Sequence, residues 1–263
     1  MEIKTFLPSD ILKPYVKCYW IYTVDKENST EVLYPGGYIE IAINIASGNL
    51  TTIINDRRIG MPNIEVLGQL TSPAKVVATT GITLLVTRFY PYTASVFFPN
   101  QVSDFTNDSI DLNDVFSSEA IGLYNRMMQQ DSITDKIDVL EFFLIQKLRI
   151  NEKKLEKLKL VNNICDRIDN DCELFKIENV ASYYGFSERF IQKLFLDFIG
   201  ITPKSFFNIR RFRKSLQLVQ SSFHSLTSIA YECGYYDQSH FIKEFKTFSG
   251  VTPSHFRHTP IEE

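Results

Sequence analysis

The chain lacks the features that mark secreted, membrane and metal-binding proteins. Among its 263 residues, no apolar run approaches the length that spans a bilayer, and residues 1–10 show no cationic segment followed by an apolar stretch. We therefore expect a cytoplasmic protein that does not associate with a membrane. The 4 cysteines include no CxxC pair and no histidines at metal-ligand spacing, so we expect reduced thiols, no metal and no cofactor. The cysteines are Cys18, Cys165, Cys172 and Cys233.

Histidine is equally scarce, which argues against catalysis by a serine, histidine and aspartate arrangement. All 4 histidines fall between positions 224 and 258, and no nucleophile and acid accompany them in a recognisable pattern. We therefore predict that the chain is not an enzyme.

Positive charge is also in short supply overall, but its distribution is uneven. The formal net charge is −3, and residues 1–150 carry 12 Lys and Arg against 17 Asp and Glu. Between positions 187 and 257 the balance reverses, with ten basic residues against five acidic ones. A local excess of positive charge on an acidic chain can supply contacts to phosphates.

What the chain does contain is an internal repeat, because the segment 180–206 recurs as 229–256. Such a repeat indicates two copies of one small helical unit. The matching positions are Lys193, Phe195, Phe198, Gly200, Thr202, Pro203 and Phe206, and each has its counterpart 50 positions later at Lys243, Phe245, Phe248, Gly250, Thr252, Pro253 and Phe256.

Each copy has the pattern of a helix, a tight turn and a second helix. In the first copy, Gly185 suits a left-handed turn and Ser187 is a good N-cap for the helix that follows. That helix would bury one apolar stripe and direct Arg189, Gln192 and Lys193 outward. Arginine and lysine can donate to guanine, and glutamine can pair with adenine, although a solvated polar face is the alternative.

The second copy repeats this architecture, with Gly234 at the turn and Asp237 as the cap. Between the copies, Thr202 and Pro203 begin a continuous helix, which would hold the two units roughly 34 Å apart, one turn of DNA. The outward residues of the second copy are Gln238, Ser239, Ile242, Lys243 and Lys246. Along the connecting helix, Arg210, Arg211, Arg213 and Lys214 are candidates for phosphate contacts or for intramolecular ion pairs.

These motifs resemble the DNA-binding domain of the AraC/XylS family of bacterial transcription regulators. The resemblance covers 158–257 and implies two helix-turn-helix units on one connecting helix. It also implies base-reading positions, which correspond to Arg189, Gln192 and Lys193 in the first unit and to Gln238, Ser239, Ile242 and Lys243 in the second. Two positions depart from the family: Ser215 replaces a common alanine, and Ile242 is apolar at a reading position. The most specific part comprises Ile229-Ala230-Tyr231-Glu232-Cys233-Gly234-Tyr235, Asp237-Gln238-Ser239-His240-Phe241, Phe245, Gly250-Val251-Thr252-Pro253 and Phe256-Arg257.

The amino-terminal half alternates apolar and polar residues, which predicts several short strands in a barrel or jelly roll. From Leu112 onward the pattern becomes helical, and a stripe from Ile133 to Leu148 would pack onto the barrel or form a dimer interface. The predicted strands are 17–24, 38–45, 64–67, 75–78 and 82–89.

Aromatic and charged residues of this half could line a ligand cavity. Arg88 shares a face with apolar residues, so it would end its strand in solvent, pair with a carboxylate such as Glu40, or meet an anionic ligand. Four short pieces carry a resemblance: Lys13-Pro14-Tyr15-Val16 with Trp20, Tyr34-Pro35-Gly36-Gly37 with Glu40, Val66-Leu67-Gly68-Gln69, and Arg88-Phe89-Tyr90-Pro91. Through them this half resembles the cupin-like sensor region of many AraC-type regulators, which implies binding of a small molecule or dimerisation. The candidate ligand-binding residues are Trp20, Tyr34, Tyr38, Glu40, Arg88 and Tyr90.

Together, the sequence predicts an α+β protein with three segments: a cupin-like sensor and dimerisation domain at 1–150, a junction at 151–160, and an all-α DNA-binding domain at 161–258. The expected function is sequence-specific transcription regulation, modulated by a small molecule. The expected partners are double-stranded DNA and RNA polymerase. A homodimer is expected if the stripe from Ile133 to Leu148 forms a dimer interface. The alternative is an interaction protein that has lost DNA affinity and regulates transcription through a protein partner.

Overall fold

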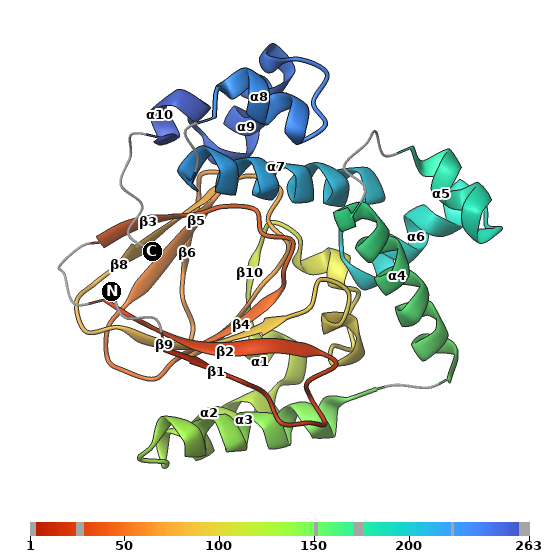
Figure 1. Cartoon of the computed structure of the whole chain (residues 1–263). Helices are drawn as coiled ribbons and strands as arrows, with labels where there is room; N and C mark the ends of the chain where they lie inside the picture. The colour runs from red at the N-terminus through yellow and green to blue at the C-terminus, as the bar shows by residue number, and fades with distance from the viewer. Residues whose placement is uncertain (1–3, 25–28, 150–151, 171–175, 222–223, 258–263) are drawn as a thin grey trace.

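The computed structural model describes residues 4–24, 29–149, 152–170, 176–221 and 224–257. Antiparallel sheets form the amino-terminal half and helices form the carboxyl-terminal half, which confirms the predicted α+β class (Figure 1). The long helix α7 (Pro203–Ser221) crosses above the sheets, with α4 to α6 near one end and α8 to α10 near the other (Figure 1).

The described strands form two sheets. The larger has the order β1-β2-β9-β4-β7-β10 and the smaller has the order β3-β8-β5-β6, and the pairings within both are antiparallel. The bounds are β1 (Lys4–Phe6), β2 (Val16–Thr23), β3 (Ser29–Leu33), β4 (Glu40–Asn44), β5 (Leu50–Ile54), β6 (Arg57–Gly60), β7 (Ile64–Leu67), β8 (Ala74–Ala78), β9 (Thr83–Phe89) and β10 (Ser109–Asp111).

The five predicted strands correspond to β2, β4, β7, β8 and β9, with ends that agree within two residues. The other five were missed. Strands β1 and β10 have three residues each, too few to show an alternating pattern, and β6 is largely exposed. Strand β5 alternates between buried and half-buried residues in the structure, but its sequence, Leu50-Thr51-Thr52-Ile53-Ile54, does not alternate between apolar and polar residues.

Both faces of the larger sheet are buried, each against a different neighbour. On β4, Ile41 and Ile43 pack into the core that continues into the helical half, while Ala42 packs with Leu84 and Val86 toward the smaller sheet. Because β4 is covered on both sides, the alternation along it distinguishes two cores, not core from solvent.

The helices cover the sheets on two sides (Figure 1). In α3, Ile137, Leu140 and Leu144 are buried within the chain. Of the two predictions for this stripe, packing onto the barrel and a dimer interface, the structure therefore favours internal packing. The bounds are α1 (Leu112–Phe116), α2 (Ser118–Met128), α3 (Ile133–Lys147), α4 (Glu152–Asn170), α5 (Ile177–Tyr184), α6 (Glu188–Phe198), α8 (Leu226–Glu232), α9 (Gln238–Ser249) and α10 (Pro253–Arg257), with 3-10 turns η1 (Ala94–Val96) and η2 (Val102–Phe105).

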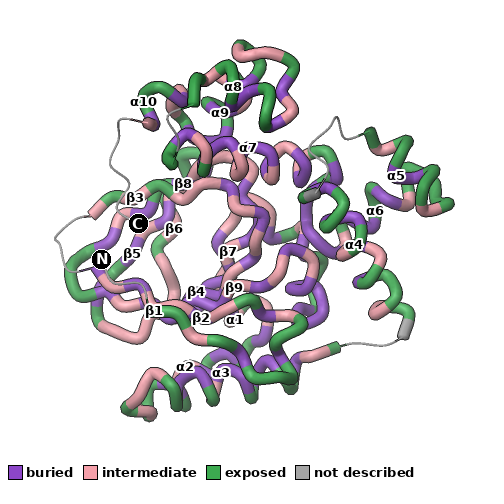
Figure 2. The backbone as a smooth tube through the Cα atoms, viewed as in Figure 1, coloured by how far each residue is buried: buried purple, intermediate pink, exposed green. Residues whose placement is uncertain are grey.

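The two halves share one apolar core. A single cluster contains Val66 of β7, Phe105 of η2, Phe195 of α6 and Phe206 of α7, and the buried segments run continuously between sheets and helices (Figure 2). From Glu152 onward the predicted junction is part of α4, which continues to Asn170, so the division into domains at 151–160 stays a proposal. Within the described ranges, no helix combines the length and apolar character needed to cross a bilayer.

Candidate DNA-binding interface

The first helix-turn-helix unit consists of α5 and α6. Gly185 ends α5 at φ 71° and ψ 27°, the left-handed region that favours glycine. The Ser187 hydroxyl accepts a hydrogen bond of 3.2 Å from the backbone N–H of Phe190 and so caps α6. The turn and the cap were both predicted from the sequence. The buried stripe of α6 comprises Ile191, Leu194, Phe195 and Phe198.

The three predicted reading residues of α6, Arg189, Gln192 and Lys193, are exposed. Lys193 also lines a shallow hollow together with Lys153 and Lys157 of α4. The outward face of α6 is therefore continuous with two further lysines that the sequence analysis did not single out. Among the described residues, no carboxylate forms an ion pair with Arg189, so its exposed guanidinium can contact a base or a phosphate.

The second unit consists of α8 and α9, and it is built in the same way. The Asp237 carboxylate accepts a hydrogen bond of 2.7 Å from the backbone N–H of His240 and caps α9. Ser239, Lys243 and Lys246 are exposed.

Two residues of the second predicted set differ from this pattern. The Gln238 side chain is half-buried and accepts a hydrogen bond of 2.6 Å from the hydroxyl of Thr227 in α8. Ile242 is half-buried and packs against the apolar core. The second unit therefore offers lysine and serine groups at its surface, while its glutamine and isoleucine are partly engaged within the protein.

Two of the four cationic residues predicted to contact phosphates from the connecting helix, Arg210 and Arg211, form ion pairs within the chain. The Arg211 side chain is 3% exposed and its guanidinium donates to both carboxylate oxygens of Glu244, at 3.0 and 2.6 Å. Arg210 donates to both carboxylate oxygens of Asp169 at 2.6 and 2.7 Å. Of the two alternatives for this helix, intramolecular ion pairing therefore describes both arginines, and contact of the part-exposed Arg210 with DNA stays a prediction.

Four of the six predicted ligand-binding residues lie together. Arg88 donates from Nε to Glu40 at 2.6 Å, and its guanidinium carbon lies 5.6 Å from the ring centre of Trp20 and 5.2 Å from that of Tyr38. Of the three alternatives for Arg88, the structure contains the ion pair with Glu40. The pKa of Arg88 is raised, because the charge and hydrogen bond of Glu40 outweigh the opposing effect of burial.

The other two predicted ligand-binding residues lie elsewhere. The Tyr34 ring packs edge to face on Phe256 of α10, with 5.5 Å between ring centres. Tyr90 stacks on Tyr92, and Tyr92 in turn donates to Asn162 of α4. These tyrosines therefore connect the sheet-bearing half to the helical half, which the sequence pattern could not reveal.

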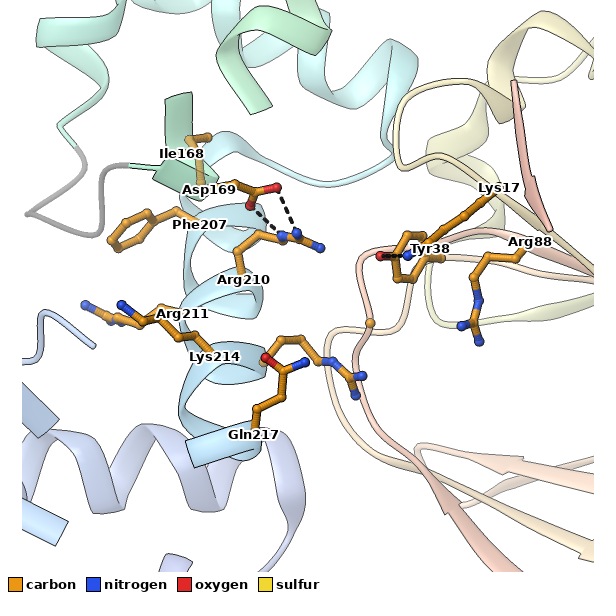
Figure 3. A pocket seen from close by; sticks show the side chains of 12 residues that line it. Lys17, Tyr38, Arg88, Ile168, Asp169, Phe207, Arg210, Arg211, Lys214 and Gln217 are labelled. Carbon is orange, nitrogen blue, oxygen red and sulfur yellow. Dashed lines mark hydrogen bonds and ion pairs between the residues drawn. The ribbon is translucent and has the colours of Figure 1, made fainter. Parts of the chain in front are cut away.

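Sequence reasoning missed the residues that face Arg88 across the molecule. A cavity of about 430 Å³ is lined by Lys17, Tyr38 and Arg88 from the sheet-bearing half and by Arg210, Arg213 and Gln217 of α7 (Figure 3). The spacing of 210, 213 and 217 is that of one helix face, so a shared direction could have been inferred. The sequence could not show which strands this helix face meets.

Of the described cysteines, Cys165 and Cys233 are buried and Cys18 is half-buried. Burial raises the pKa of the Cys165 thiol well above its usual value and is also the main cause of the raised pKa of Cys18. Within the described residues, no group of three or more histidine, cysteine, aspartate and glutamate side chains could hold a metal ion. Cys172 lies outside the described residues.

Comparison with known proteins agrees with this geometry. Residues 180–259 match the family model described as a helix-turn-helix domain, and residues 4–111 match a model described as a domain of unknown function (DUF6597). The HTH-type transcriptional activator RhaS of Salmonella arizonae is 34% identical over 80 residues, which are 30% of this chain and 29% of that protein. The carboxyl-terminal region is accordingly an AraC-family helix-turn-helix domain.

Two further similarities extend the comparison. The F1 operon positive regulatory protein of Yersinia pestis is 28% identical over 107 residues, which are 40% of this chain and 36% of that protein. The solved structure of ToxT from Vibrio cholerae aligns over 98% of both chains at 12% identity, with a TM-score of 0.49. The chain spans less than half the length of the curated relatives it matches.

Proposed function

We propose that this chain is a sequence-specific DNA-binding transcription regulator that places α6 and α9 in successive major grooves. One observation carries the proposal: two capped helices of the same design expose polar amino-terminal faces and are joined by one continuous helix, α7. In helix-turn-helix proteins the second helix of the unit enters the major groove, and its amino-terminal residues contact base edges.

Base contacts are assigned to residues that the structure leaves exposed. In α6 these are Arg189, Gln192 and Lys193, and in α9 they are Ser239 and Lys243, with Lys246 available for a phosphate. Gln238 can contribute if its hydrogen bond with Thr227 opens, and Ile242 can contribute only apolar contact.

The sheet-bearing half is proposed to modulate this activity by binding a small molecule. Its shared core with α6 and α7 supports the idea, because a change in the sheets would be transmitted to the helix that carries both units. We also propose that the protein acts in the cytoplasm, contacts RNA polymerase and forms a homodimer. We propose no catalytic activity for it.

The competing function is that of an interaction protein without DNA affinity. The exposed Arg189, Lys193 and Lys243 favour DNA, because a module that binds only protein has no need for cationic groups at base-reading positions of both copies. Salt dependence separates the two functions, since release of counterions from phosphates makes DNA affinity fall steeply with rising salt. A flat salt titration would support the interaction protein.

The test begins with selection of DNA by the purified chain from a random pool. Affinity for the selected sequence is then measured for Arg189→Ala and Lys193→Ala, with Lys75→Ala as a control that removes an exposed charge from β8. We expect each reading variant to lose about 1–3 kcal/mol of specific binding, and the control to lose none. An unchanged ratio of specific to nonspecific affinity in both reading variants would refute the assignment.

A further inference from the structure

The cavity between α7 and the sheets has an excess of positive charge. Its lining includes Lys17, Arg88, Arg210, Arg213 and Lys214 (Figure 3). Among the described residues, Glu40 pairs with Arg88 and Asp169 pairs with Arg210, while Lys214 donates to the backbone carbonyl of Glu232 in α8. Arg211 also lines the cavity, but it points to the opposite side of α7 and is neutralised there by Glu244 (Figure 3).

Arg213 is the residue whose charge is least compensated. It is half-buried, and no carboxylate of the described residues lies within ion-pair distance of its guanidinium. Burial is the main cause of its lowered pKa, Tyr38 opposes the shift, and the nearby charges of Arg88 and Arg210 add to it. A guanidinium held among other cations is unfavourable unless an anion joins them.

The sheet side of the cavity is fixed in place. The Tyr38 hydroxyl accepts a hydrogen bond of 2.9 Å from Lys17 Nζ, and the same lysine lies 4.8 Å from the ring centre. Burial opposes ionisation of the Tyr38 phenol, but Lys17 and Arg210 outweigh burial and lower its pKa. The phenol oxygen therefore lies between two cations, Lys17 from the sheets and Arg210 from α7. An anionic group of a ligand at this position would meet the same two cations.

The size and the walls of the cavity define the ligand class. Its volume, about 430 Å³, lies within the roughly 300–1,000 Å³ of small-molecule sites. Apolar side chains are sparse, since Ile168 and Phe207 are the aliphatic and phenyl groups of the lining. A long hydrocarbon chain would find little apolar surface here, whereas phosphate or carboxylate groups would meet paired donors from arginines.

We propose that this cavity binds a compact small molecule with two or more anionic groups, which bridges Lys17 and Arg88 on the sheets to Arg210 and Arg213 on α7. This inference rests on the proposed function in one respect: it identifies the class of effector for the regulator. Since α7 carries both helix-turn-helix units, a ligand that ties α7 to the sheets fixes how both units are held.

The test is calorimetric titration of the full chain at constant ionic strength and without DNA. The probes are inorganic pyrophosphate, citrate and oleate, and the variants are Arg213→Gln and Lys17→Gln. We expect pyrophosphate or citrate to bind one molecule per chain, and both variants to bind it at least tenfold more weakly. Arg58→Gln on the exposed strand β6 makes the same charge change as Arg213→Gln away from the cavity and should bind as the unmodified chain does.

Thermal unfolding gives a second measurement. The bound anion should raise the unfolding temperature of the unmodified chain and of Arg58→Gln, but not that of Arg213→Gln. Arg213→Gln removes an uncompensated charge, so it is expected to fold, and Lys17→Gln tests the opposite wall independently.

Three outcomes of the titration would overturn the inference. They are no binding of either pyrophosphate or citrate, equal binding by Arg213→Gln and Arg58→Gln, and binding of oleate alone. A loss of DNA affinity in Arg213→Gln with a shallower salt dependence, and no loss of pyrophosphate or citrate binding, would assign Arg213 to phosphates of DNA and would also overturn it. Failure of the proposed function gives a different pattern, in which the chain binds the small anion but shows no salt-dependent affinity for DNA.

Discussion

Arg210 and Arg211 are neighbours in sequence, yet they meet different carboxylates on different sides of α7. Successive residues of a helix are rotated by about 100°, so a cluster of basic residues in the sequence divides between two surfaces. Asp169 lies 41 positions from Arg210, and Glu244 lies 33 positions from Arg211. The sequence could suggest ion pairing as one alternative, but only the tertiary structure identifies such distant partners.

The Arg211–Glu244 pair gives the first prediction at this scale. Glu244→Gln should lower the free energy of unfolding by about 3–5 kcal/mol, because it leaves a buried guanidinium without its countercharge. Chemical denaturation with two spectroscopic probes measures the change. Asp10→Asn, which removes the partner of Lys13 in an exposed pair, is the control and should leave stability unchanged. Equal stability of the two variants would show that the buried pair contributes no more than the exposed pair.

Glu65 gives the second residue-scale prediction, because it is a buried carboxyl group inside the sheet-bearing half. Burial raises its pKa to about 7, a hydrogen bond from Ser109 opposes the shift, and the charge of Glu40 adds to it. The folded state therefore binds this proton more tightly than the unfolded state does. Its contribution to stability is fully present below the unfolded pKa near 4.5 and is lost as pH rises to about 7.

Glu65→Gln should remove that pH dependence. Between pH 4.5 and pH 7 the unmodified chain should lose up to about 3 kcal/mol relative to the variant, at roughly 1.4 kcal/mol per pKa unit. Unfolding free energies measured across this pH range for both proteins provide the comparison. Parallel pH profiles would mean that Glu65 does not titrate differently in the folded and unfolded states.

At the scale of elements, local chemistry explains why the helices of the second half were predictable. Ser187 and Asp237 accept the backbone hydrogen bonds expected of N-caps, and Thr202 accepts one from Ser205 at the start of α7. These signals involve residues three positions apart, so the sequence contains them completely. The edge strands carry too little pattern of their own to be predicted, because β1 and β10 have three residues each and β6, which pairs with the adjacent β5, is largely exposed.

Two glycines that end helical segments allow a matched test of such local and distant effects. Gly185 has φ 71° with no atom within 4 Å of an added Cβ, whereas Gly200 has φ 91° and its Cβ would lie 2.9 Å from the carbonyl oxygen of Val102. Gly185→Ala should cost about 1–2 kcal/mol from the left-handed backbone alone. Gly200→Ala should cost about 1–3 kcal/mol more, because η2 must also move.

Equilibrium unfolding of the two variants measures that difference. In a folded fragment that lacks η2, the extra loss of stability at Gly200 should disappear. In the full chain, Gly200→Ala should weaken the contact between α6 and η2, where the Thr106 hydroxyl donates to the Gly200 carbonyl at 2.7 Å. Backbone amides near Thr106 should then exchange their hydrogens faster. Equal losses at both glycines would mean that α6 and η2 are not held together as the structure has them.

At the scale of the whole molecule, the repeat predicted the paired helix-turn-helix units but not their attachment to the sheets. Gly37 approaches Phe206 and Ile209 of α7 so closely that an added Cβ would lie 3.6 and 4.0 Å from them, and Tyr34 packs on Phe256. Such contacts join segments that share no pattern, so no sequence period reports them. The same contacts brought two of the predicted sensor residues, Tyr38 and Arg88, to the wall of a cavity that faces α7.

A continuous α7 whose inner face is buried in the shared core should make the two units act as one rigid reader. Its core-facing residues Phe206, Ile209, Phe212 and Val219 are fully buried, so neither end of α7 can swing without exposing aromatic and aliphatic surface. The preferred DNA should therefore present its two contacted grooves about one helical turn apart, near 10–10.5 base pairs.

Inserting five base pairs between the two contacted segments of the selected DNA should lower affinity at least tenfold at constant salt. The insertion turns the second groove to the opposite side of the duplex, and a rigid linker cannot follow it, so only one unit keeps its specific contacts. Replacing the same central base pairs without insertion is the control and should change affinity little. If the inserted and uninserted sites bind equally well, α7 does not fix the spacing of the units, and the tight packing of its buried face on the rest of the chain would have no role in DNA recognition.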